Sequence, residues 1–387
     1  MKNIFALVLP FVAATSWYFV AKRNTRSNQF KKGVVPKDYL LGLNFLLNEQ
    51  PDKAVDIFIK MLEVDSDTVE THLALGSLFR RRGEVDRAIR IHQNLIARPR
   101  LDKQERNMAL IALGQDYMSA GMFDRAERIF LEVVASGEET IASLYYLLDI
   151  YQQEKAWQEA SEIAQKISDK TGEAMHCQIA QYYCEQAVHV KNVNLNLAKK
   201  HLKKALTIDK SCIRANLLLG EVAMQEEKYA DSIEYYEAIK QQDVDFISET
   251  LIPLKQCYEA LNKRNEFINY LQKLLTQHAR ISLILVLADL VLQEQGANAA
   301  IELITTYLYR YPSVRGLKRL IELQLLQSPD ENSKTLYLLQ SIATSILLDK
   351  PIYRCHHCGF SSKSLLWLCP SCKSWNTVKP IHGLEGD

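Results

Sequence analysis

The sequence contains little glycine and little proline. Of its 387 residues, 14 are Gly and 10 are Pro, about half of the roughly 7% and 5% found in average proteins. Because β-sandwiches and barrels need frequent Gly-rich turns, this shortage disfavours an all-β fold. The phosphate-binding patterns G-x-G-x-x-G and G-x-x-x-x-G-K-[ST] are also missing, which disfavours a nucleotide-binding α/β fold. We therefore expect a long, mostly helical protein.

Acidic side chains are missing from the first 37 residues. This stretch holds seven Lys or Arg and so carries a charge of +7, whereas the rest of the chain holds 40 basic and 46 acidic residues. An acidic body disfavours nucleic acid as the main partner. The positive stretch therefore needs a local explanation.

That explanation is a membrane anchor. Residues 3–21, NIFALVLPFVAATSWYFVA, carry no charge. As a helix they would span about 28 Å, close to the roughly 30 Å of a bilayer core. Trp17 and Tyr18 lie at the end that meets the basic cluster, as interfacial aromatic residues do, and the positive-inside rule then places residues 22–387 in the cytoplasm. We expect a single-pass transmembrane anchor at 1–21 and a basic juxtamembrane linker at 22–34. A cleaved signal peptide is the alternative, but its positive charges would precede the apolar run.

Similar local sequences recur at intervals of 34, 38, 34, 38, 34, 35 and 33 residues. They are marked by Ala54, Ala88, Ala126, Ala160, Ala198, Ser232, Phe267 and Ala300. Glycine lies twelve residues earlier in four units, at positions 42, 76, 114 and 220. This is the tetratricopeptide (TPR) pattern, in which small residues let the two helices of a unit approach closely. It predicts an all-α TPR superhelix over 35–349, with eight units and a degenerate capping helix pair at 316–349.

The first helices of the repeats are expected to line a groove that binds a partner. In the second and fourth units the candidate positions are Ser77, Arg80, Arg81, Tyr145, Asp149 and Gln152. The alternative is that these positions are simply solvated, because Lys and Arg near a helix C-terminus also favour the helix dipole.

The eight cysteines fall into two groups. Cys177, Cys184, Cys212 and Cys257 lie within repeats and are interpreted as small core residues. The other four form Cys355-x2-Cys358 and Cys369-x2-Cys372, a spacing that suits one Zn or Fe ion at a four-cysteine site. Two disulfides and a redox C-x-x-C are the alternatives; the first is disfavoured in the cytosol. Residues 350–387 are too few to fold on their own core, so we expect the metal to hold this domain together.

The two knuckles resemble those of rubredoxin. Tyr353-Arg-Cys-His-His-Cys-Gly matches the first, and Trp367-Leu-Cys-Pro-Ser-Cys the second, with a shorter insertion between them. Four thiolates leave no open coordination position for hydrolysis. Two alternatives remain open: an electron carrier using iron, and a nucleic-acid-binding ribbon. The second would use the basic residues Lys350, Arg354, Lys363, Lys373 and Lys379.

An anchor, a TPR array and a terminal rubredoxin-type ribbon together resemble the lipopolysaccharide assembly protein B family, most clearly over 42–96 and 353–381. The resemblance implies a non-enzymatic adaptor at the Gram-negative inner membrane. Its implied partners are a membrane AAA protease, the lipid A deacetylase delivered to it, an inner-membrane regulator, and lipopolysaccharide synthesis and transport proteins. The metal ligands carry over to Cys355, Cys358, Cys369 and Cys372.

Overall fold

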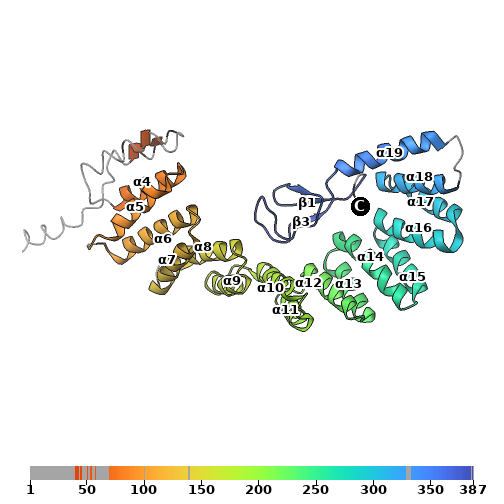
Figure 1. Cartoon of the computed structure of the whole chain (residues 1–387), viewed down its shortest axis with the longest axis horizontal. Helices are drawn as coiled ribbons and strands as arrows, with labels where there is room; N and C mark the ends of the chain where they lie inside the picture. The colour runs from red at the N-terminus through yellow and green to blue at the C-terminus, as the bar shows by residue number, and fades with distance from the viewer. Residues whose placement is uncertain are drawn as a thin grey trace, which may run out of the picture. The chain divides into compact units, whose positions relative to one another are not determined.

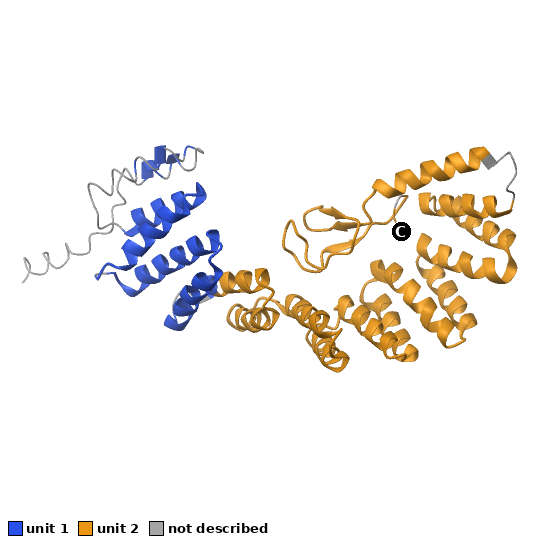
Figure 2. Ribbon diagram, viewed as in Figure 1, with its two compact units in different colours: residues 1–143 blue, residues 144–387 orange. Residues whose placement is uncertain are grey.

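The computed structural model describes residues 69–387 except 100, 138–139, 328–332, 385 and 387, together with 40–42, 44, 45, 50, 53, 54 and 57. It divides into two compact units, residues 1–143 and 144–387, which Figure 2 shows in separate colours.

Helices make up most of the residues that the structure describes in both units (Figure 1). The first unit contains α4 (Val69–Arg81), α5 (Val85–Ile96), α6 (Lys103–Ser119) and α7 (Phe123–Ser136), and α8 (Thr140–Gln153) follows. The second unit continues with α9 (Trp157–Thr171), α10 (His176–Val190), α11 (Leu195–Ile208), α12 (Ile213–Gln225), α13 (Tyr229–Gln242), the short 3-10 helix η1 (Val244–Phe246), α14 (Ile247–Ala260), α15 (Arg264–Gln277), α16 (Ile281–Gln295), α17 (Ala297–Arg310), α18 (Val314–Gln327) and α19 (Ser333–Asp349). The predicted mostly helical repeat fold is confirmed.

Close packing at the predicted repeat positions explains the pattern. The eight marker residues, from Ala54 to Ala300, are all 0–1% exposed. The glycines face large rings of the second helix in the same unit: a Cβ added to Gly114 would lie 2.6 Å from Phe130, and one added to Gly220 would lie 2.6 Å from Tyr236. Real Cβ atoms do not approach this closely, so glycine is required where the helices meet.

None of the helices that the structure describes is both long and apolar enough to cross a membrane. The anchor expected at 1–21 and the linker expected at 22–34 lie outside the described residues.

The C-terminal ribbon contains three short antiparallel strands in the order β2-β1-β3. They are β1 (Tyr353–Cys355), β2 (Ser361–Ser362) and β3 (Val378–Pro380). Tyr353 pairs with Ser362 on one side and with Pro380 on the other. The central strand ends at Cys355, the first cysteine of the first knuckle, and the predicted small ribbon after the repeats is confirmed.

Candidate metal centre and its contacts with the repeats

Both cysteine pairs lie in the same kind of backbone turn. In the first, the Gly359 N–H donates to the Cys355 carbonyl at 2.9 Å, and in the second the Lys373 N–H donates to the Cys369 carbonyl at 2.9 Å. The two donor residues, Gly359 and Lys373, have φ angles of +80° and +57°. Glycine adopts this left-handed conformation freely, whereas a residue with a side chain is disfavoured there. Glycine therefore suits the first turn, whereas the second turn places a lysine in the same conformation.

The two turns bring four sulfur atoms together. All four Sγ atoms lie within 4.8 Å of one another, with Cys355 and Cys372 at 3.7 Å and Cys358 and Cys369 at 3.6 Å. A tetrahedral ion with metal–sulfur bonds of about 2.3 Å separates its ligands by about 3.8 Å. The four cysteines therefore fit one Zn or Fe ion without a rearrangement of the chain.

Hydrogen bonds from nearby hydroxyl groups lower the pKa of two of these cysteines, Cys355 and Cys372, whereas burial raises the pKa of Cys369 to about 11. Hydrogen bonds from the side chain and backbone of Ser374 lower the pKa of Cys372 to about 5, so its sulfur is a thiolate at neutral pH. The Thr377 hydroxyl lies 3.3 Å from the sulfur of Cys355. The thiolate is the form of cysteine that binds metal. Four such ligands complete a tetrahedral shell and favour a structural ion.

The ribbon has a small core of its own. Tyr353, Cys355, Cys369 and Val378 are buried, and Phe360 is among the few side chains that pack around them. Two of the four core residues are metal ligands. Loss of the ion would therefore remove much of what holds the strands together.

Trp375 joins the ribbon to the helices at the beginning of the second unit. Its ring meets Trp157 and Tyr182 edge-on, with centroids 6.0 and 5.7 Å apart. Its indole N–H donates to the side-chain oxygen of Gln152 at 3.0 Å. Only 8% of the residue is exposed. The indole is therefore buried by repeat residues more than 190 positions away in the sequence.

Trp367 makes a second aromatic contact further along the repeats. It stacks on Phe246 of η1, with centroids 5.7 Å apart and ring planes at 13°. The Arg214 guanidinium lies 5.8 Å from the centroid of the same indole. Stacked rings and a cation over an indole face are both favourable. The ribbon is thus held by tryptophans at two separate places.

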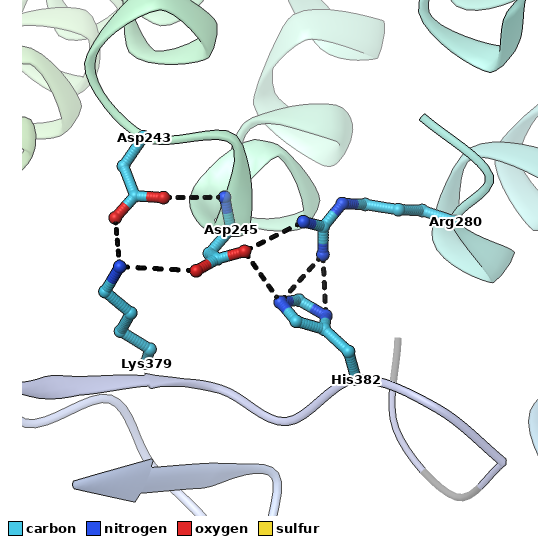
Figure 3. Close-up of polar contacts among 5 residues, drawn as sticks. All are labelled: Asp243, Asp245, Arg280, Lys379 and His382. Atoms are coloured by element: carbon cyan, nitrogen blue, oxygen red, sulfur yellow. Dashed lines mark hydrogen bonds and ion pairs between the residues drawn. The ribbon is translucent and has the colours of Figure 1, made fainter. Parts of the chain in front are cut away.

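A cluster of charges forms the third contact (Figure 3). Lys379 of β3 donates to Asp243 at 2.6 Å and to Asp245 at 3.3 Å. Asp245 also accepts from Arg280 at 2.9 Å and lies 3.0 Å from a ring nitrogen of His382. Partial burial raises the pKa of the Asp245 carboxyl, but hydrogen bonds from Arg280 and Lys379 outweigh it and lower that pKa. The carboxylate is therefore ionised and links a ribbon lysine to a repeat arginine.

The ribbon already contacts one of the six predicted groove residues, Gln152. Two others in that unit have local partners: Tyr145 donates to Glu173, and Asp149 accepts from Gln153 at 3.0 Å. The role of these three residues in binding a partner stays a prediction.

The first unit contains the other three groove candidates. Arg81 is exposed and Ser77 is half-buried. Arg80 instead donates to the fully buried carboxylate of Asp116 at 2.7 Å and to Gln115 at 2.7 Å. Its side chain therefore stabilises the packing of α4 on α6, whether or not it also meets a partner.

Asp116 belongs to a buried network that sequence reasoning missed. Its second carboxylate oxygen accepts from Nδ1 of His92, and both side chains are completely buried. Nε2 of the same histidine has no hydrogen-bond partner among the described residues, and its ring packs where Gly76 lacks a side chain. The one signal in the sequence is a charged residue two positions after Gly114, the repeat glycine of the third unit.

Comparisons with known proteins agree with both parts of this description. Residues 353–380 match the family model described as "Rubredoxin metal binding domain", and residues 71–106 match "Tetratricopeptide repeat". The chain is 39% identical to lipopolysaccharide assembly protein B of Escherichia coli K12 and 34% identical to that of Haemophilus influenzae Rd, in each case over 100% of both chains. A solved kinesin light chain with TPR-like repeats is 19% identical to this chain. The match covers 44% of this chain and 92% of the kinesin light chain, with a TM-score of 0.33, and it carries no argument about function.

Proposed function

The chain belongs to the lipopolysaccharide assembly protein B family, and we propose that it serves lipopolysaccharide assembly as a non-enzymatic adaptor. In this proposal the chain binds the deacetylase that commits its substrate to lipid A synthesis, and it delivers this enzyme to a membrane AAA protease. It also gathers lipopolysaccharide synthesis and transport proteins, and an inner-membrane regulator opposes the delivery. The full-length similarity, covering both the repeats and the four-cysteine ribbon, is the observation that carries the proposal.

The uncharged run at 3–21 supports placing the adaptor at the inner membrane. A single-pass anchor with the basic linker 22–34 on the cytoplasmic side would bring residues 22–387 to the surface where the protease works. The anchor would also restrict the diffusion of the adaptor to the plane of the membrane. The anchor is thus proposed as part of the delivery mechanism, and not only as a tether.

The contacts of the ribbon suggest how the repeat surface is divided. In the second unit, the ribbon covers Gln152, Tyr182 and Phe246. A partner approaching these residues would have to compete with two tryptophans and the Asp245 cluster. We propose that the first unit, where Arg81 is exposed, offers a groove surface to the deacetylase, and that the ribbon keeps the second unit in a fixed form.

Depletion of the protein tests the proposal. The amount of lipid A deacetylase, measured by immunoblot, should rise several-fold while its messenger RNA stays constant. The reason is that depletion slows the degradation of the deacetylase and leaves its synthesis unchanged. A catalytically inactive variant of the protease should give the same rise, with no further increase on depletion. An unchanged amount of deacetylase after depletion would contradict the adaptor role.

A further inference from the structure

Two buried thiols lie side by side in the second unit, away from the metal knuckles. Cys184 is on α10 and Cys212 immediately precedes α12, and their sulfur atoms are 3.8 Å apart. They are 0% and 1% exposed. A disulfide needs sulfurs about 2.05 Å apart, so an approach of roughly 1.8 Å separates this pair from a covalent bond.

The surroundings make the two sulfurs chemically different. The hydrogen bond from Cys184 and the backbone amide of Ala215 lower the pKa of Cys212 against the effect of burial. Burial and the same pairing raise the pKa of Cys184 well above its usual range. Cys212 is at the N-terminus of α12, where the negative charge of Asp209 raises its pKa and the positive charge of Arg214, two residues later, lowers it. A thiolate at a helix N-terminus beside an arginine is the arrangement in which cysteine becomes nucleophilic.

We propose that Cys184 and Cys212 are an oxidation site at which hydrogen peroxide produces an intramolecular disulfide between α10 and α12. The thiolate of Cys212 attacks one peroxide oxygen, the O–O bond breaks, and the leaving hydroxide takes a proton to become water, which leaves Cys212 as a sulfenic acid. The thiol of Cys184 then attacks that sulfur. The S–O bond breaks, and the hydroxyl group leaves with the thiol proton as a second water. Two thiols are oxidised by two electrons, and one peroxide is reduced to two waters.

The burial of both sulfurs selects the oxidant. A bulky disulfide such as oxidised glutathione cannot reach them in the folded protein, whereas peroxide is small and uncharged. Cys177, two turns earlier on α10, is half-buried, and its pKa is raised to about 11 by burial and the nearby Asp209. It therefore stays a thiol and does not compete for peroxide.

The cross-link would join two successive repeats beside the ribbon contact. Arg214 donates to Glu185 at 2.8 Å, and these two residues lie close to the two cysteines in the sequence. The same guanidinium covers the indole of Trp367. Arg214, two residues after Cys212, thus also contacts the metal domain.

Peptide mapping of the oxidised full chain tests this inference. The purified, metal-loaded protein is treated with hydrogen peroxide, its remaining thiols are alkylated, and a digest is analysed without reduction. The expected product is a peptide pair joined through Cys184 and Cys212, lost on treatment with dithiothreitol. Cys257→Ser is the matched control: it removes another buried repeat cysteine, whose sulfur contacts Ser232 at 3.4 Å, and should leave the cross-link intact.

The order of the steps has its own test. In Cys184→Ser the sulfenic acid on Cys212 has no thiol to react with, so dimedone added together with denaturant should label Cys212, and far-UV circular dichroism before denaturation should show that the variant is folded. Full alkylation of both cysteines after peroxide treatment of the wild-type chain would overturn the oxidation site. A dimedone label on Cys184 in Cys212→Ser, with none on Cys212 in Cys184→Ser, would overturn the assigned nucleophile.

Discussion

Replacing Trp367 with alanine should weaken the attachment of the ribbon to the repeats without removing its metal. The change removes the stacking on Phe246 and the contact with the Arg214 guanidinium. An aromatic pair contributes about 0.5–1.5 kcal/mol beyond area burial, and a cation–π contact about 0.5–1 kcal/mol. Together these contacts amount to about 1–2.5 kcal/mol, which weakens the docking equilibrium by about 5- to 70-fold.

Trp375 reports on this equilibrium because it is buried only while the ribbon is attached. Release moves its indole from between Trp157 and Tyr182 into water, which shifts its fluorescence emission to longer wavelengths. A urea titration followed by that emission detects release, and far-UV circular dichroism in the same samples detects unfolding of the helices. In Trp367→Ala the fluorescence midpoint should fall relative to the circular dichroism midpoint, at unchanged metal content.

Two variants bracket the expected effect. Trp367→Phe keeps an aromatic ring against Phe246 and should show less than half of the shift. Arg354→Ala changes an exposed residue of β1 and should show none. If Trp367→Ala and Arg354→Ala had the same fluorescence midpoint, the assignment of Trp367 as a docking residue would be refuted.

Three further outcomes are expected. Cys355→Ser combined with Cys358→Ser should abolish metal binding in elemental analysis and unfold the ribbon while the helical circular dichroism is retained; a full equivalent of bound metal would exclude the four-cysteine site. Asp116→Asn should lower the free energy of unfolding of the first unit by about 3 kcal/mol, because it leaves the Arg80 charge without its buried partner, whereas Glu132→Gln, at an exposed position of α7 in the same unit, should change it by less than about 0.5 kcal/mol; equal effects would show that the buried network is not stabilising. Deletion of residues 1–21 should move the protein from the membrane to the soluble fraction of a cell lysate, and continued sedimentation with membranes would argue against the anchor.

Local rules were sufficient to predict the repeats and the metal knuckles. The two helices of a unit pack closely where a small residue faces a large one. The positions of Gly76, Gly114 and Gly220 therefore predict where the helices of each unit meet. The C-x-x-C spacing likewise determines a knuckle, because the turn that places both sulfurs is closed within five residues. In both cases the information lies in positions that are neighbours in the fold and close in the sequence.

The attachment of the ribbon to the repeats could not be predicted in this way. The indole of Trp375 meets Gln152 across 223 positions, and no periodicity links such distant residues. The available signal was indirect: the ribbon has more large aromatic residues than its small core can bury. Arg80 shows the same limit over a shorter distance in the sequence. Its place near the end of a helix suggested a solvated or partner-binding side chain, whereas its ion-pair partner Asp116 lies in the next repeat.

The proposal that this chain promotes the removal of the lipid A deacetylase is tested most directly by a pulse-chase measurement of that enzyme's half-life. The half-life should lengthen several-fold in cells that lack the protein and return to its normal value when the full chain is restored. It should stay long when the restored chain carries both Cys355→Ser and Cys358→Ser. A half-life that is the same with and without the protein would contradict the claim.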